Sequence, residues 1–261
     1  MQEVLALALQ SMHQDMQRLD RTGLNLANAL TPGYQREVTA ARPLRLGSPS
    51  FAALMGMAPA PADSTLAQAQ GGALSSDVLV RIDQRPATLR STGQSLDVAL
   101  AGPGYFEVAT PDGPAYTRQG SLRLDGQGRL VTEQGHAVMG RGGEIQLPSR
   151  QVRIDAQGNV FDAQAADRSD RPIAQLKVVQ PSHASQVQRL GEGLLRIDGS
   201  PEQLADADVR IQQGFVENSN VSSMHEMVQL MQTMRHFESM QKAALGYDEM
   251  TGQAIRKLGE L

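Results

Sequence analysis

The sequence contains no cysteine and no tryptophan, and only 3% of its 261 residues are aromatic. Without cysteine the chain cannot form disulfides, use thiol chemistry or bind a metal through thiolates. Lysine and arginine number 24 against 28 aspartates and glutamates, and no run of five like charges occurs. The charge pattern therefore offers no electrostatic surface for nucleic acid or an acidic membrane, and we expect neither as a partner.

Long hydrophobic runs are missing too. No stretch approaches the roughly 18 to 20 apolar residues that cross a bilayer, so we expect no direct membrane insertion. The chain begins Met1-Gln2-Glu3, with an acid where a secretory signal carries Lys or Arg. The apolar run from Val4 to Leu9 is shorter than the hydrophobic region of such a signal. We therefore expect no cleaved signal for general secretion.

Patterns for catalysis or metal binding are sparse as well. The segment 225–229 (HEMVQ) lacks the second histidine that a zinc-protease helix places one turn later. The glycine-rich segments 102–104 and 140–143 open no predicted helix, which favours tight turns over a phosphate-binding loop. Asp125-Gly126 and 155–158 lack the alternating ligands of a calcium loop. We predict no catalytic residue, no metal site and no cofactor.

Both ends of the chain carry apolar residues at helical spacing. At the start the steps alternate between 4 and 3, interrupted only by Gly23. Near the end the same steps recur from Met227 to Phe237, and after polar Gln241 and Asp248 the stripe resumes at Ile255 and Leu258. A seam of this period is a surface for another helix. We predict an assembly interface at Leu5, Leu9, Met12, Met16, Leu19, Leu26, Met227, Leu230, Met231, Met234, Phe237, Ile255 and Leu258.

The last helix also holds six of the twelve methionines, at positions 224, 227, 231, 234, 240 and 250. Thioether side chains can fill a core or form a contact surface that adapts to different neighbours, and the sequence leaves both readings open. Proline and glycine at Pro32-Gly33 should end the first helix. Ser223 and Glu226 form a capping box, which predicts the start of the last helix.

Between the helices the sequence indicates β structure. Short alternating runs such as 96–100 and 209–211 are separated by Asp-Gly pairs, which is typical of hairpins in an antiparallel domain. Residues 43–76 are rich in Ala, Ser, Gly and Pro and indicate a linker or extended arm. We therefore predict an α+β fold in which paired, long, coiled-coil-like terminal helices flank a mostly antiparallel β domain.

Three segments resemble the flagellar rod and hook proteins, in the order that family has them, and together they span nearly the whole chain except the arm. They are 25–36 (NLANALTPGYQR), 96–121 with its LDVAL, GYF and YTRQGS elements, and 214–238, which runs from GFVENSNV to RHFE. Within the family, 135–148 and 186–189 look most like the proximal rod members, with the distal rod members as the alternative. The matching motif residues are Asn25, Leu26, Ala27, Asn28, Thr31, Pro32, Gly33, Tyr34, Glu217, Ser219, Asn220, Val221, Arg235 and Glu238.

The resemblance implies a structural subunit with no enzymatic activity, exported by the flagellar type III apparatus and polymerised with other rod proteins into the tube that crosses the periplasm and transmits torque. An export chaperone is a further partner that it allows. It divides the chain into a helix and turn at 1–34, an arm at 35–76, a β domain at 77–213 and a helix at 214–261 that packs on 1–34. The alternative from another class is a β-domain enzyme or binding module with helical dimerisation arms.

Overall fold

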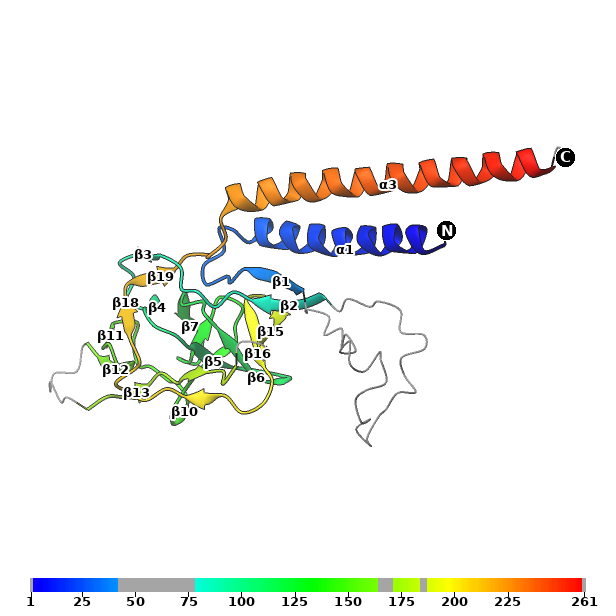
Figure 1. Ribbon diagram of the computed structural model, residues 1–261. Coiled ribbons are helices and arrows are strands. Elements are labelled where there is room, and N and C mark those ends of the chain that lie inside the picture. The colour runs from blue at the N-terminus through cyan, green and yellow to red at the C-terminus, as the bar shows by residue number, and fades with distance from the viewer. Residues whose placement is uncertain (1, 42–77, 164–170, 184–186, 260–261) are drawn as a thin grey trace, which may run out of the picture. The chain divides into compact units, whose positions relative to one another are not determined.

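The computed structural model describes residues 2–41, 78–163, 171–183 and 187–259 (Figure 1). Among these residues one helix lies at each end, α1 (Gln2–Ala27) and α3 (Ser223–Gly259), and short strands occupy the sequence between them. The described residues up to 38 and from 81 onward form one compact unit, and the predicted arm at 43–76 lies outside the described residues. The strands β1 (Glu37–Ala41) and β2 (Val78–Ile82) pair in a two-stranded sheet.

The largest sheet has the order β15-β16-β6-β5-β9-β8-β7, with β10 added to β9, β14 added to β5 and β17 added to β14. Its neighbouring strands pair antiparallel throughout the described residues. Its strands are β5 (Tyr105–Thr110), β6 (Gly113–Thr117), β7 (Leu122–Leu124), β8 (Leu130–Thr132), β9 (Ala137–Gly140), β10 (Gly143–Glu144), β14 (Val178–Gln180), β15 (Val187–Gly191), β16 (Leu194–Ile197) and β17 (Glu202–Gln203).

Three smaller antiparallel sheets complete the described strands. They are β11 (Val152–Ile154) with β12 (Asn159–Asp162) and β13 (Ala174–Gln175), β4 (Val98–Leu100) with β18 (Ile211–Gln213), and β3 (Leu89–Ser91) with β19 (Phe215–Glu217). The main core draws on these strands and on the large sheet, and includes fully buried Leu100, Phe106, Leu130 and Ile145. The β-rich middle of the chain therefore has an apolar core of its own.

Asp-Gly turns set several of these hairpins, as the sequence predicts. Asp112-Gly113 lies at the turn between β5 and β6, and Asp125-Gly126 at the turn between β7 and β8. The Asp125 carboxylate accepts hydrogen bonds from the backbone N–H groups of Gln127 and Arg129, which lowers its pKa. The Asp155 carboxylate likewise accepts hydrogen bonds from the backbone N–H groups of residues 157 and 159. These carboxylates stabilise turns, whereas Asp198-Gly199 joins β16 to β17, which do not pair with each other.

The helices α1 and α3 lie side by side and run in opposite directions, with both chain termini at the same end of the pair (Figure 1). Among the α1 side chains from residue 8 onward, which the structure describes, the buried ones are polar, namely Asp15, Thr22 and Asn25. Glu226 is the one buried side chain among those that the structure describes in α3. Asp15 Oδ2 lies 2.5 Å from His236 Nδ1 and so bridges the two helices. The contact between the helices is therefore rich in polar groups.

The predicted fold class is wrong. The described fold is mostly β, with a shorter N-terminal helix of 26 residues and a C-terminal helix of 37 residues. The helices do not pair as a coiled coil with a buried apolar seam, because Leu9, Met16, Met227 and Met234 are about half exposed. The apolar period showed correctly that one helix face is hydrophobic. It carried no information about which surface covers that face, and within the subunit polar residues take the buried positions.

Candidate functional site

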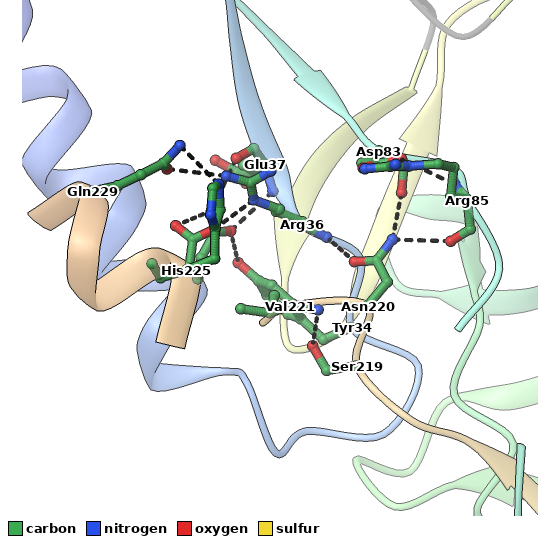
Figure 2. Close-up of polar contacts among 12 residues, drawn as sticks. Tyr34, Arg36, Glu37, Asp83, Arg85, Ser219, Asn220, Val221, His225 and Gln229 are labelled. Atoms are coloured by element: carbon green, nitrogen blue, oxygen red, sulfur yellow. Dashed lines mark hydrogen bonds and ion pairs between the residues drawn. The ribbon is translucent and has the colours of Figure 1, made fainter. Parts of the chain in front are cut away.

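A cluster of polar side chains joins the end of α1 to the start of α3 (Figure 2). We call it the junction cluster, and its members are Asn25, Tyr34, Arg36, Glu37, Asn220 and Glu226. They come from α1, the turn after it, β1, the segment before α3 and α3 itself. Residues nearly 200 positions apart in sequence thus meet where the chain leaves one helix and enters the other.

Asn25 is the centre of this cluster. Its Oδ1 accepts hydrogen bonds from the Glu37 N–H at 2.9 Å and the Tyr34 hydroxyl at 3.2 Å. Its Nδ2 donates to the Glu37 carbonyl at 2.9 Å and to Glu226 Oε2 at 3.4 Å. The side chain is 1% exposed, and all four of its hydrogen-bonding positions are used. The Asn25 side chain therefore bonds to both backbone groups of Glu37 in β1, as a residue of a neighbouring strand would.

Glu226 holds the start of α3 to the chain leaving α1. Its carboxylate is 1% exposed, and Arg36 Nε donates to Oε1 at 2.5 Å. Arg36 also donates to Gln229 Oε1, one turn further along α3, at 3.0 Å. The predicted capping role of this carboxylate is wrong, because both oxygens face Arg36 and Asn25. A buried carboxylate needs a paired cation, and here that requirement outweighs capping.

Asn220 connects three segments of the chain. Its Oδ1 accepts from the Arg36 N–H at 2.6 Å, and its Nδ2 donates to the carbonyls of Asp83 and Arg85 at 2.8 and 3.0 Å. Its own N–H donates to the Tyr34 carbonyl at 3.2 Å. Figure 2 shows the bonds from the Asn220 side chain to Arg36, Asp83 and Arg85. The segment before α3 is thereby fixed to the residues that precede β1 and to those that follow β2.

The junction cluster is also tied to the large sheet. Arg189 on β15 donates from Nε to Glu37 Oε1 at 2.7 Å and from a terminal nitrogen to the Gln35 carbonyl at 2.5 Å. Its guanidinium lies 4.1 Å from the centroid of the Tyr34 ring. Burial raises the pKa of Tyr34, so its hydroxyl stays protonated and donates to Asn25. The other carboxylate oxygen of Glu37, Oε2, lies 3.6 Å from Nη1 of Arg21 on α1.

The turn after α1 packs directly on the backbone of the β domain. Gly33 donates its N–H to the Glu217 carbonyl at 2.8 Å and has a φ of +69°. The side chain of Glu217 accepts a hydrogen bond at Oε2 from Arg118 Nη1 at 3.1 Å, and both side chains are 2% exposed. The Arg118 guanidinium lies 5.4 Å from the Tyr105 ring, whose pKa burial raises to about 12. Tyr105 donates its hydroxyl to Gln35.

Both helices also carry exposed apolar side chains. The α1 stripe consists of Leu9, Met16 and Leu24, which are 52% to 55% exposed. The α3 stripe consists of Met224, Met227, Met231 and Met234, which are 48% to 80% exposed and recur every three or four residues.

The structure brings part of the predicted motif set together. Asn25, Tyr34 and Asn220 belong to the junction cluster, and Gly33 and Glu217 adjoin it. Asn28 caps α1 by donating to the Leu24 carbonyl at 2.9 Å and accepts from the Thr31 hydroxyl at 3.2 Å. Leu26, Ala27, Pro32, Ser219 and Val221 lie beside these residues in sequence, with Ser219 Oγ accepting from the Val221 N–H. Arg235 and Glu238 are exposed on α3.

The predicted interface residues fall into three groups. Leu9, Met16, Met227, Met231 and Met234 are exposed, whereas Met12, Leu19, Leu26, Leu230 and Phe237 are partly buried. Leu5, Ile255 and Leu258 lie in the helices, but their side chains are outside the described residues. Sequence reasoning gave no role to Gln35, Arg36, Glu37, Arg118 or Arg189. Gln35, Arg36 and Glu37 could have been found as a run of amide and charged residues directly after the predicted helix end, whereas nothing in the sequence marked Arg118 or Arg189 as neighbours of that run.

Two other observations limit the chemistry of the described residues. Within them, no three His, Cys, Asp or Glu side chains gather closely enough to hold a metal ion. No helix in the part of the chain that the structure describes is long and apolar enough to cross a membrane. The junction cluster and the stripes are therefore the features for which a function must be found.

Comparison with known proteins gives consistent matches. The family model described as "Flagellar hook protein FlgE/F/G D1 domain" matches residues 99–162, and "Flagellar basal body rod FlgEFG protein C-terminal" matches residues 212–257. The chain is 30% identical over 268 aligned residues to the flagellar basal-body rod protein FlgF of Escherichia coli (strain K12), with 99% of each chain covered. FlgF of Salmonella typhimurium gives the same identity and coverage. The rod protein FlgG of Bacillus subtilis (strain 168) is 29% identical, with 91% of this chain and 92% of FlgG covered.

Proposed function

The chain belongs to the family of flagellar basal-body rod proteins, and from that premise we propose that it is the proximal rod subunit and that its α1 and α3 stripes are the contacts through which subunits polymerise. It is a structural component of the flagellar basal body and not an enzyme. This membership removes the alternative of a β-domain enzyme or binding module with dimerisation arms. The proximal position rests on the FlgF relatives, which align over 99% of their length.

The observation that carries this proposal is the exposure of the α3 stripe. Four methionines that are 48% to 80% exposed on one stretch of helix do not stabilise a soluble monomer. Burial of such side chains against a neighbouring subunit removes apolar surface from water and so favours assembly. Assembly with other rod proteins is a property of the family. The stripes are the surfaces that we assign to the contact between subunits.

Export through the flagellar type III apparatus is part of the same proposal, and so is the position of the assembled protein in the rod that crosses the periplasm. It is supported by the relatives named FlgF, which are flagellar basal-body rod proteins. An export chaperone is compatible with this route, because the apolar stripes need protection before assembly. Electron microscopy of basal bodies that carry a tagged chain would locate its axial level. Label at the hook end of the rod would contradict the proximal position.

Met234→Asp is expected to reduce incorporation into basal bodies by at least about tenfold, because burying an unpaired carboxylate in a subunit contact costs several kcal/mol. Met234 is 48% exposed in the subunit, so the fold should tolerate the change. The measurement is the amount of protein in purified basal bodies, with expression checked in whole cells. Gln232→Asp is the matched control, because Gln232 is an exposed α3 residue outside the stripe.

Normal amounts of the Met234→Asp protein in basal bodies would contradict the proposed interface. Loss of both aspartate variants would point to a general effect of negative charge on α3. Leu19→Asp should also block incorporation. It is the weaker test, because Leu19 is partly buried in the subunit and its replacement would disturb the monomer.

A further inference from the structure

The α3 stripe exposes four thioether groups on one face of a helix. Met224, Met227, Met231 and Met234 are 80%, 51%, 52% and 48% exposed. They recur every three or four residues, so their side chains lie over successive turns of α3. Glu226, which bonds to α1, is 1% exposed on another face of the same helix. The contact with α1 therefore leaves the sulfur atoms of the stripe accessible to small molecules in water.

Thioethers are the groups of this chain that a peroxide oxidises most readily. Thiols compete with thioethers for oxidants, and the sequence contains no cysteine. Exposure then decides which methionines react, because the oxidant has to reach a lone pair on sulfur. Among the described residues, Met16 and Met250 are exposed to a similar degree, whereas Met139 on β9 is only partly exposed. Oxidation of the free subunit should therefore concentrate on the α3 stripe, where four neighbouring sulfur atoms share one surface.

We propose that the α3 stripe is a site of reversible oxidation, at which hydrogen peroxide converts methionine into methionine sulfoxide in the free subunit and so blocks its assembly. This rests on the proposed function and adds a chemical control to the same surface. The sulfur lone pair attacks one oxygen of the peroxide, so that an S–O bond forms while the O–O bond breaks. Sulfur is oxidised by two electrons and the peroxide is reduced. The departing hydroxide takes the proton of the transferred hydroxyl and leaves as water.

Oxidation makes the stripe unsuited to an apolar contact. A sulfoxide is polar and carries an oxygen that accepts hydrogen bonds, whereas the thioether is apolar. Burial of that oxygen in the proposed subunit contact without a donor disfavours the assembled state. A sulfoxide at any one of the four positions has this effect, so the stripe responds to a small dose of oxidant. Methionine sulfoxide reductases restore the thioether, which makes the block reversible.

Peptide mass spectrometry on the purified subunit tests the position of the site. After a short treatment with hydrogen peroxide, Met224 and Met231 should carry sulfoxide at least about threefold more often than Met139, because their sulfur atoms are more exposed. Equal oxidation of the α3 stripe and Met139 would overturn the assignment of the site.

The consequence for assembly is tested with the variant Met224→Leu/Met227→Leu/Met231→Leu/Met234→Leu. Leucine keeps the apolar character and nearly the volume of methionine but has no sulfur. Cells that lack methionine sulfoxide reductases synthesise the chain briefly and are treated with peroxide, which is then removed so that basal bodies form. Incorporation of the native chain should fall by at least about fivefold relative to untreated cells, whereas the leucine variant should lose little. Met139→Leu is the matched control and should remain as sensitive as the native chain.

A second measurement uses the native chain alone, so it does not depend on how well the leucine variant assembles. In the treated cells, sulfoxide at the α3 stripe should be at least about fivefold more frequent in the unassembled chain than in the basal bodies formed afterwards. Equal sulfoxide content in the two pools, or equal losses of the native chain and the leucine variant, would overturn the inference. If Met234→Asp still fails to assemble in that case, the oxidation site is wrong and the proposed function stands.

Discussion

Gly33→Ala is expected to destabilise the protein by about 3 kcal/mol and to separate the turn after α1 from the β domain. A left-handed φ of +69° costs alanine roughly 1 kcal/mol. A Cβ at this position would also lie 2.6 Å from the carbonyl carbon of Arg118 and from the backbone nitrogen of Gln119. Backbone cannot rotate away as a side chain can, so the turn must shift, which costs roughly another 1 to 3 kcal/mol.

The structural consequence should extend into the junction cluster. Gly33 donates to the Glu217 carbonyl, and the next residue, Tyr34, bonds to both Asn25 and Asn220. A shifted turn would weaken these bonds together. Urea unfolding followed by circular dichroism measures the stability loss, and hydrogen exchange at the backbone amide of Glu37, which donates to Asn25 Oδ1, reports on the junction cluster.

Gly93→Ala is the matched control for this prediction. Gly93 has a φ of +70°, nearly the same as Gly33, but a Cβ there would meet no atom within 4 Å. Its replacement should therefore cost only the conformational part, about 1 kcal/mol. If Gly33→Ala costs no more than Gly93→Ala, the close packing of the turn on the β domain is not a source of stability.

Arg118→Met should cost about 3 to 5 kcal/mol, because it leaves the Glu217 carboxylate buried without its cation. Both side chains of this pair are 2% exposed, and the carboxylate also accepts a hydrogen bond from the Ala87 N–H. Methionine keeps most of the volume of the arginine stem, so little of the loss comes from a cavity. Equilibrium unfolding in urea measures the change in stability.

The double variant Arg118→Met/Glu217→Gln separates charge from packing. Glutamine keeps an acceptor for the Ala87 N–H while removing the second charge, so the double variant should recover most of the stability lost by Arg118→Met. Arg118 Nε has no hydrogen-bond partner within the described residues, which limits what the native pair contributes. Arg85→Met is the control, because Arg85 is 80% exposed in its pair with Asp83, and it should change stability less than Arg118→Met. No recovery in the double variant would contradict the charge explanation.

The sequence predicted the elements of this fold better than their contacts. Asp112-Gly113 and Asp125-Gly126 marked hairpins because turn conformation depends on adjacent residues. The junction cluster could not be predicted in the same way. Asn25 meets Glu226, 201 residues later, and Arg36 meets Glu226 across 190 residues. Such bonds follow from how the helices pack on the β domain, and no local pattern records that packing.

The helical seams show a different limit of sequence reasoning. A period of 3.5 correctly indicated apolar helix faces, but the predicted coiled-coil pairing was wrong, because Asp15, Thr22 and Asn25 occupy the buried positions of α1. Periodicity identifies a face and leaves its partner unknown. In a protein that polymerises, the partner of the most apolar face can be another subunit. At Gly23, the one interruption of the first seam, an added Cβ would meet no atom within 4 Å, and the same holds for Gly246 and Gly252 of α3.

The most direct test of this account is the accessibility of single thiols at Met16→Cys and Met231→Cys. Both parent side chains are more than half exposed in the subunit, so a maleimide should label both variants rapidly in the monomer. In intact purified basal bodies the same positions should be protected by at least about tenfold, and dissociation of the rod should restore labelling. Equal labelling of monomer and basal body would contradict the claim that these stripes are buried between subunits.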